Sequence, residues 1–395
     1  MPLSLLAGPA NAGKVALLLD RYRAALEADP FLIVPNRPDV DRAERELLKS
    51  TGALVGGSIG TFDDLFQRIA RSNGSQRPVV TEAQRTLLLR RVVAQRIARG
   101  DGLRSARFAG FADSLGATVA ELESGLLEPG ELEGDLADLY RAYREELDRL
   151  GLWDRELERR YAAERVAREL EAWDGRPVFA YGFEDLTGAE WALLEALAGR
   201  SHVTVSLPYE PGRDAFASLS RTSDDLNALA DERTELRPNP EARRPVLAYL
   251  ERALFGETAA SAPILDGSIR FLEGAGLRGT LELVAEEVLS LLRSGTPAEE
   301  IAVVCPSLER WRAPLDTAFS TLGVPYALEG RVRLGQTPFG QALLVLLRYA
   351  WLDGERRDLF AFLRSPYSAL ARSHVDFLEG RMRGCAVNRP DRFEE

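Results

Sequence analysis

The chain has 395 residues, of which 45% are hydrophobic and 28% charged, and this ordinary globular composition excludes disordered and collagen-like chains. Its formal net charge of −11 argues against a protein that coats nucleic acid through overall positive charge, although a local basic groove remains compatible with it.

Cysteine occurs only at Cys305 and Cys385, so the chain cannot supply an iron–sulfur cluster or a four-thiolate metal site. The apolar run Leu3–Ala7 is too short for a signal peptide, and no other stretch resembles a membrane span. We therefore expect a reduced, cytoplasmic setting and no membrane partner.

The first 70 residues alternate between strand and helix patterns. A short apolar run at 3–7 predicts a strand, and the continuous apolar run at 31–34 is typical of a buried parallel strand. A third strand is expected within 52–60. Helical spacing of apolar residues follows at 14–28 and 38–49, and Thr61 is expected to cap a helix that ends near residue 71. This alternation predicts a parallel sheet with helices on both faces.

Strand signals disappear from about 76 to 175, where four amphipathic helices are expected, at 81–99, 107–123, 131–150 and 154–172. Alternation resumes with strands at 177–181 and 202–207 around a helix at 187–198. A linker is expected at 233–245 and a helix at 246–254. Further strands are expected at 269–272 and 301–305, each followed by a helix, and a helical end from about 337. Four tryptophans are expected in the core: Trp153, Trp173, Trp191 and Trp351.

Residues 8–14 read Gly-Pro-Ala-Asn-Ala-Gly-Lys, which fits the phosphate-binding pattern G-x-x-x-x-G-K between a strand and a helix. Lysine occurs only at Lys14 and Lys49, so chance would produce only about 0.014 such motifs in a chain of this composition. The glycines and the helix N-terminus suit a phosphate, and Lys14 supplies positive charge. We predict nucleotide-phosphate contacts from this loop: Gly8, Asn11, Ala12, Gly13, Lys14 and Val15.

The eighth position of the motif normally carries a serine or threonine whose hydroxyl binds Mg²⁺. Here it is Val15, which has no oxygen in its side chain. We therefore expect phosphate binding without a magnesium site.

The order of motifs resembles the UvrD-like helicases, and specifically the AddB family of helicase-like subunits from AddAB-type helicase–nucleases. The likeness rests on the N-terminal phosphate loop, on Ser58-Ile59-Gly60-Thr61-Phe62, which is similar to the DNA-touching motif Ia, and on Gly182 to Thr187, which is similar to the Gly-Phe-x-x-Phe-Thr of AddB subunits. It spans about residues 1–350 and is diffuse outside these motifs.

This resemblance implies an α/β P-loop NTPase (RecA-like) fold with a parallel sheet, an all-helical insertion and the start of a second RecA-like domain. The implied divisions are residues 1–75 and 176–256 for the first domain, 76–175 for the insertion, and 265–395 for the second domain with a helical C-terminal segment. We interpret the chain as the N-terminal portion of a longer protein.

The sequence departs from the helicase pattern where catalysis would occur. Tyr181 and Gly182 stand where active helicases carry the aspartate that helps to hold Mg²⁺ and the glutamate that activates water. The nuclease motif implied for full-length AddB needs a lysine after a carboxylate, and no lysine follows Lys49. We expect no catalytic residue and no metal ligand in this chain.

Candidate DNA contacts are Thr61 and Phe62, in motif Ia, together with arginines at the start of the insertion, foremost Arg85, Arg90 and Arg91. The arginine stripe continues with Arg96, Arg99, Arg104 and Arg107, against few acids. The alternatives are that Phe62 is a core residue and that the stripe is a solvated helix face.

Taken together, the sequence favours a non-hydrolysing, helicase-like scaffold that binds single-stranded DNA, and is able to bind ATP, beside an AddA-type motor subunit in double-strand break repair and recombination. The alternatives are an active ATP-dependent helicase with an atypical metal site, and a nucleotide-binding interaction protein with no DNA role.

Overall fold

The computed structural model describes residues 3–72, 77–100, 104–108, 110–238, 244–254, 256, 261–328 and 332–382. The chain divides into two compact units, Met1–Ser268 and Ile269–Glu395. The first unit carries the sheet and the phosphate-binding motif, and the second is helical in its described residues.

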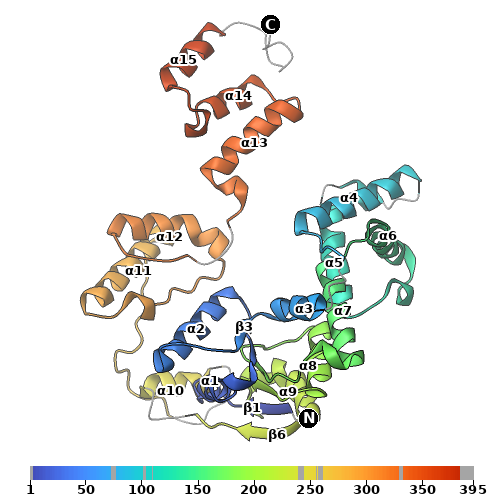
Figure 1. The fold of residues 1–395 in the computed structure, drawn as a ribbon. Coiled ribbons are helices and arrows are strands. Elements are labelled where there is room, and N and C mark those ends of the chain that lie inside the picture. Colours follow the sequence, from blue (N-terminus) through green and yellow to red (C-terminus); the bar gives the residue numbers. More distant parts are fainter. Residues whose placement is uncertain are drawn as a thin grey trace. The chain divides into compact units, whose positions relative to one another are not determined.

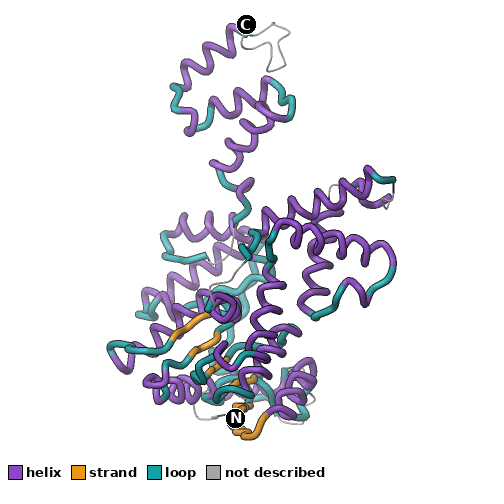
Figure 2. The backbone as a smooth tube through the Cα atoms, turned by 45° about the vertical axis from the view of Figure 1, so that its right-hand side comes forward, coloured by secondary structure: helices purple, strands orange, loops and turns teal. Residues whose placement is uncertain are grey.

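The first unit is built on a six-stranded sheet in which every pair of neighbours is parallel, with strand order β3-β2-β4-β5-β1-β6. Figure 2 shows these strands among the surrounding helices. In register, Leu5 lies opposite Val205 on one side and Arg233 on the other. The strands are β1 (Leu3–Ala7), β2 (Phe31–Ile33), β3 (Ser58–Gly60), β4 (Val178–Ala180), β5 (Val203–Leu207) and β6 (Ala230–Glu235).

Hydrophobic clusters cover both faces of the sheet, because neighbouring residues of a strand point to opposite sides. Leu6 and Leu32 pack with residues of α1 (Lys14–Ala24) and α2 (Arg37–Thr51). Leu5 and Ile33 pack on the other face, with α3 (Phe62–Arg71), α8 (Gly188–Ala198) and α9 (Ser220–Leu229). This three-layer arrangement confirms the predicted α/β fold of RecA-like type.

The edge strand β6 was missed by the sequence interpretation, which placed a linker from residue 233. Its sequence, Ala-Asp-Glu-Arg-Thr-Glu, is polar and largely exposed, whereas the five other strands are mostly apolar. An edge strand needs little burial, and charged side chains there discourage pairing with other chains. After β6, the chain reaches α10 (Pro245–Ala253).

A helical insertion occupies the interval between β3 and β4, as predicted. Figure 1 shows α4, α5 and α6 projecting away from the sheet, while α7 packs on α3 and α8. The insertion has its own core, which includes Leu89, Val119, Tyr140 and Tyr143. Its helices are α4 (Glu82–Ala98), α5 (Phe111–Ser124), α6 (Gly134–Leu150) and α7 (Arg155–Arg168), with a short 3-10 helix η2 (Arg104–Arg107) after α4.

A buried polar cluster joins the helices of this insertion. Arg144 of α6 donates to Glu123 of α5 at 3.2 Å, and the Tyr143 hydroxyl donates at 2.8 Å to Asp154, the N-cap of α7. Both carboxyl groups are buried. Burial, and the charge of Asp154 beside it, raise the pKa of Glu123 to about 9. Burial therefore favours the protonated form of the Glu123 carboxyl group.

The second unit contains α11 (Gly276–Arg293), α12 (Leu308–Leu322), α13 (Pro338–Trp351), α14 (Arg356–Leu363) and α15 (Arg372–Arg381). The strands predicted at 269–272 and 301–305 were wrong: both segments are irregular, with Phe271 92% and Val304 91% exposed. A strand exists only when its backbone pairs with a neighbour, and neither segment has a paired strand among the described residues.

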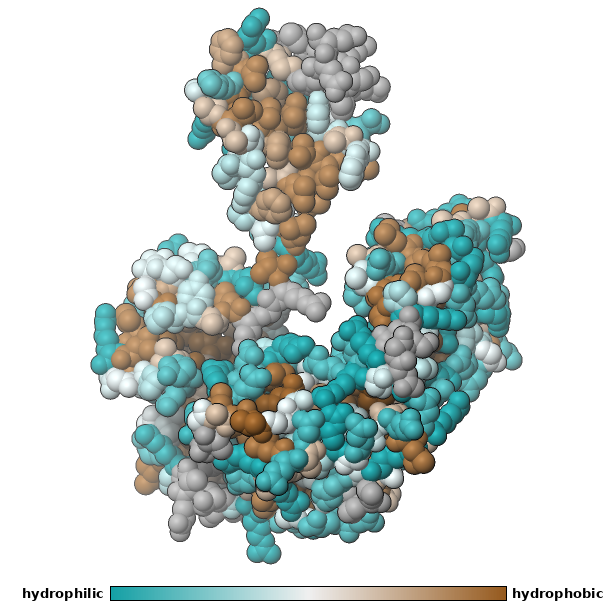
Figure 3. All heavy atoms as spheres, viewed as in Figure 1, coloured by the Kyte–Doolittle hydropathy of each residue, from teal (hydrophilic) through white to brown (hydrophobic). Residues whose placement is uncertain are grey.

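Apolar side chains also remain at the surface of the last three helices, where Figure 3 shows hydrophobic atoms gathered. Trp351 is 78% exposed, so its prediction as a core residue was wrong, whereas Trp173 is buried. Among the described residues, no helix has the length and apolarity needed to cross a membrane.

The buried carboxyl of Glu123 makes stability depend on pH. Because its folded pKa of about 9 lies above the unfolded value near 4.5, the folded state binds more protons between these values, and stability falls as pH rises through this window. We expect Glu123→Gln, which is neutral at every pH, to raise the melting temperature at pH 8 by about 2–4 °C, and less at pH 5.

Thermal unfolding followed by circular dichroism at pH 5, 6.5 and 8 measures this difference. Glu121→Gln, on the exposed side of the same helix, is the control and should leave the melting temperature unchanged at each pH. A Glu123→Gln gain that does not grow with pH would contradict the protonated state.

Candidate nucleotide and nucleic-acid site

The phosphate-binding motif forms the loop between β1 and α1, at the carboxyl edge of the sheet. Asn11 and Gly13 adopt positive φ angles of 58° and 85°, which turn backbone N–H groups within the loop. A side chain at Gly8 would meet the Leu236 carbonyl oxygen at 2.5 Å, so only glycine fits where the chain after β6 passes. The apex of the loop is exposed. The sequence motif is therefore folded into an open loop with its glycines required by geometry.

Lys14 is the first residue of α1 and is buried. Its Nζ donates to the Pro9 carbonyl oxygen at 2.5 Å, and the Ala12 N–H donates to the same oxygen at 3.3 Å. Burial lowers the pKa of the Lys14 ammonium. No side chain caps this helix and its first turn has no acid, so its N–H groups and its positive dipole end remain for an anion.

The groups that would hold and use a metal are absent from their expected positions. Val15 is 40% exposed, so an apolar side chain stands where a hydroxyl would bind Mg²⁺. Tyr181 follows β4 and packs against the hydrophobic cluster of α1 and α2. Gly182 has a φ of 84°, and a Cβ there would lie 2.8 Å from Pro35 Cγ, so a glutamate would be strained. The residues present fit a phosphate group but not a magnesium ion.

Thr61 and Phe62 follow β3 at this same edge of the sheet. The Thr61 hydroxyl accepts a bond from the Asp64 N–H at 3.4 Å and donates to its carboxylate at 2.9 Å, which confirms the predicted cap. Phe62 is only 3% exposed, and its ring packs against Phe183 with 4.8 Å between centroids. This placement is that of a core residue, the alternative to stacking on a base.

The predicted arginine contacts lie on α4, apart from the phosphate loop. Arg85 points inward and donates to the Gly116 carbonyl at 2.7 Å. Arg90 and Arg91 are exposed but face acids, with Asp113 at 3.7 Å and Glu146 at 3.3 Å. These acids belong to α5 and α6. The sequence alone did not predict that these two helices pack beside the arginines of α4.

Arg37, at the start of α2, is a charged residue of the carboxyl edge that sequence reasoning missed. Its side chain is exposed and pairs with Asp64 at 2.7 Å, which connects the ends of β2 and β3. After β5, Glu210 pairs with Arg213 at 2.9 Å and with Arg252 of α10 at 3.4 Å. The only sequence signal for Arg37 was its position directly after a predicted strand.

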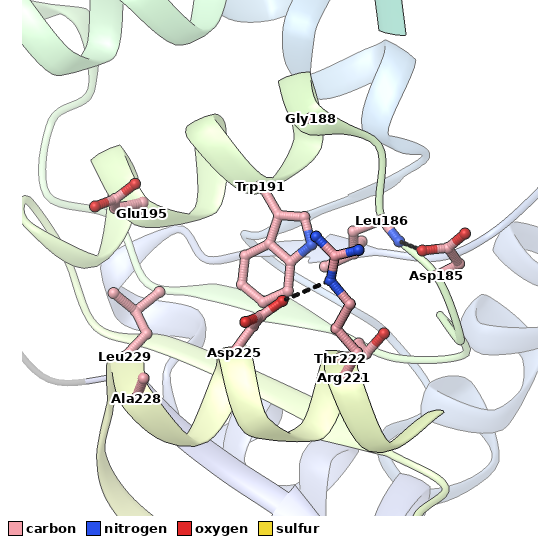
Figure 4. Close-up of a pocket in the computed structure, with 10 residues that line it drawn as sticks. All are labelled: Asp185, Leu186, Gly188, Trp191, Glu195, Arg221, Thr222, Asp225, Ala228 and Leu229. Carbon is pink, nitrogen blue, oxygen red and sulfur yellow. Dashed lines mark hydrogen bonds and ion pairs between the residues drawn. The ribbon is translucent and has the colours of Figure 1, made fainter. Parts of the chain in front are cut away.

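A separate cleft of about 690 Å³ lies between α8 and α9, beside the Gly182-to-Thr187 segment. Figure 4 shows Trp191, Arg221 and Asp225 directed into it. Its other acids are Asp185 and Glu195, so three carboxylates oppose one guanidinium. This negative balance disfavours a phosphate ligand in the cleft.

Comparison with known proteins agrees with this arrangement. Residues 5–251 match the model of the family described as "ADDB, N-terminal". The proteins named as an ATP-dependent helicase/deoxyribonuclease subunit in Symbiobacterium thermophilum and Moorella thermoacetica are 27% and 29% identical over 94% and 96% of this chain. The protein of the same name from Bacillus velezensis is 24% identical over 86% of it.

The aligned regions cover 36%, 37% and 33% of these three relatives, so the chain spans about a third of their length. The family model, in contrast, covers more than half of the present chain. The chain therefore belongs to the AddB N-terminal family.

Proposed function

We propose that this chain is a non-hydrolysing, helicase-like scaffold that holds nucleotide phosphates and single-stranded DNA beside an AddA-type motor subunit. The process it serves is the repair and recombination of double-strand breaks in the cytoplasm. Its relatives are named as a subunit of an ATP-dependent helicase/deoxyribonuclease, which supports work within a complex.

One observation carries this proposal: the phosphate loop retains its fold and its lysine while three catalytic positions have lost their chemistry. Lys14 and the uncapped start of α1 suit a phosphate. Val15, Tyr181 and Gly182 offer no carboxylate or hydroxyl oriented for a metal or for water activation. A phosphate loop in this state binds without turning over its ligand.

ATP fits the loop through its phosphates. The backbone N–H groups of residues 11, 13 and 14 would hold them, and Lys14 and the Ala12 N–H would exchange the Pro9 carbonyl for a phosphate oxygen. That exchange replaces a neutral acceptor by a charged one, which strengthens the hydrogen bond. The loop is thus stable without ligand and gains from binding one.

Single-stranded DNA is proposed to cross the carboxyl edge of the sheet near Thr61. Support comes from the family and from the exposed guanidinium of Arg37 at the same edge. Phosphate contacts would come from this surface, since the cleft between α8 and α9 is acidic.

Calorimetric titration with ATP tests the nucleotide part of the proposal. We expect binding of similar affinity with Mg²⁺ and with EDTA, because Val15 has no side-chain oxygen at the position that would hold the metal. Lys14→Ala should weaken this binding by about tenfold or more, corresponding to at least about 1.4 kcal/mol.

Lys49→Ala is the matched control, because Lys49 is the one other lysine and is exposed on α2, where it pairs with Glu46 at 2.9 Å. It should leave ATP affinity unchanged. Magnesium-dependent binding with ATP turnover would instead establish an active ATPase. If ATP does not bind at all, the loop has only a structural role and the nucleotide part of the proposal is wrong.

A second prediction concerns the lost metal ligand. Val15→Thr adds a hydroxyl at the magnesium position, so we expect Mg²⁺ to strengthen ATP binding by about threefold or more in this variant. Turnover should stay absent, because positions 181 and 182 still lack carboxylates. Val15→Ala removes the same side chain without adding oxygen and should show no magnesium effect. Equal responses of the two variants would contradict this explanation of residue 15.

A further inference from the structure

The arginines of the predicted stripe separate into two groups when their surroundings are compared. Along the body of α4, acids of α5 and α6 face the guanidinium groups. Arg96, for example, lies 2.9 Å from Asp138 and 3.7 Å from Asp135. Together with the pairs of Arg90 and Arg91, these contacts neutralise the body of the helix.

The end of the helix differs. Arg99 caps α4, and Arg104 and Arg107 lie on η2, which packs against α4. All three are exposed, and within the described part of the chain no acidic side chain lies within 4.0 Å of their guanidinium nitrogens. Figure 1 places this end of α4 at the outer part of the insertion, away from the sheet. We name Arg99, Arg104, Arg107 and Phe108 the tip patch.

Phe108 adds an aromatic ring to this patch. It follows Arg107 directly and is 75% exposed, and its N–H is tied to the Ser105 carbonyl at 3.1 Å. The ring is thus held on an ordered turn while its surface stays open to solvent. Sequence reasoning did not select Phe108, which fell inside the helix expected at 107–123.

Three exposed guanidinium groups and an exposed ring on adjacent elements are a combination that suits single-stranded nucleic acid. Guanidinium groups take phosphates, and an aromatic face stacks on an unpaired base at about 1–3 kcal/mol per base. The patch is also a positive region on a chain of net charge −11, so it concentrates attraction for a polyanion at one place.

We propose that the tip patch is a second binding site for single-stranded DNA, distinct from the carboxyl edge of the sheet. Arg99, Arg104 and Arg107 contact phosphates, and Phe108 stacks on a base. The inference rests on the proposed DNA-binding function and moves the arginine contact from Arg85, Arg90 and Arg91 to the end of the insertion.

Fluorescence anisotropy of a labelled single-stranded 30-mer, measured with the whole chain at several salt concentrations, tests the proposal. We expect Arg99→Gln/Arg104→Gln/Arg107→Gln to lower affinity by about tenfold or more at low salt. It should also reduce the salt slope by about 2, since each phosphate contact on single strands contributes about 0.7. Phe108→Leu keeps an apolar side chain and should lower affinity about threefold or more with the slope unchanged.

The matched control is Arg90→Gln/Arg91→Gln, which removes two arginines of the same helix that already face acids. It should leave affinity and slope close to those of the unmodified chain. Unchanged melting temperatures would show that the variants fold.

Failure of the unmodified chain to bind the oligonucleotide would overturn the proposed function itself. Binding that is insensitive to the tip variants would overturn the inference alone. A loss of equal size in the Arg90/Arg91 control would assign binding to the whole stripe and also overturn it. The triple arginine variant could instead lose more affinity for a blunt duplex than for the single strand, with no effect of Phe108→Leu. That result would show that the tip patch binds duplex DNA rather than single strands.

Discussion

The parallel pairing of β1 between β5 and β6 is the constraint on which the rest of the first unit depends. Since every strand runs the same way, the carboxyl ends of all six meet at one edge, and the segments that follow them become neighbours. Pairing continues to the end of β1, where the Leu236 N–H donates to the Ala7 carbonyl at 2.8 Å. The chain then passes over the next residue so closely that glycine is required at position 8. The first glycine of the phosphate motif is therefore fixed by the sheet as well as by any ligand.

This dual role explains how the loop can keep its shape without a bound ligand. Lys14 has a buried partner inside the loop, so its position does not depend on a nucleotide. Tyr181 contributes to the hydrophobic cluster beneath α1 and α2, and Gly182 lets the chain pass Pro35. Tyr181 and Gly182 thus have packing roles of their own. A carboxylate side chain at position 182 would cost backbone strain, so the fold itself favours glycine there.

Local signals predicted much of this architecture. Five strands were marked by short, mainly apolar runs, and several helices by side-chain caps such as Thr61. Both signals depend on only a few neighbouring residues. The remaining features depend on distant partners. The polar segment β6 forms a strand because its backbone pairs with β1. Residues 301–305 are apolar but form no strand, because no strand among the described residues pairs with them. Phosphate-loop residues were contiguous and easily found, whereas the pairing of Arg91 with Glu146 links positions far apart in the sequence.

The distribution of charge, rather than its sum, decides where an acidic chain can meet DNA. Acids of α5 and α6 neutralise the arginines that they face, so net charge is lowered without leaving an attractive surface along the body of α4. The buried cluster of Glu123, Tyr143, Arg144 and Asp154 ties these helices together, which keeps the acids in register with their partners. In the tip patch, no acid among the described residues pairs with the arginines, so their positive charge stays exposed. An insertion whose α4 arginines face acids and whose end is basic would hold DNA at that end, away from the phosphate loop, so that binding at one place need not disturb the other.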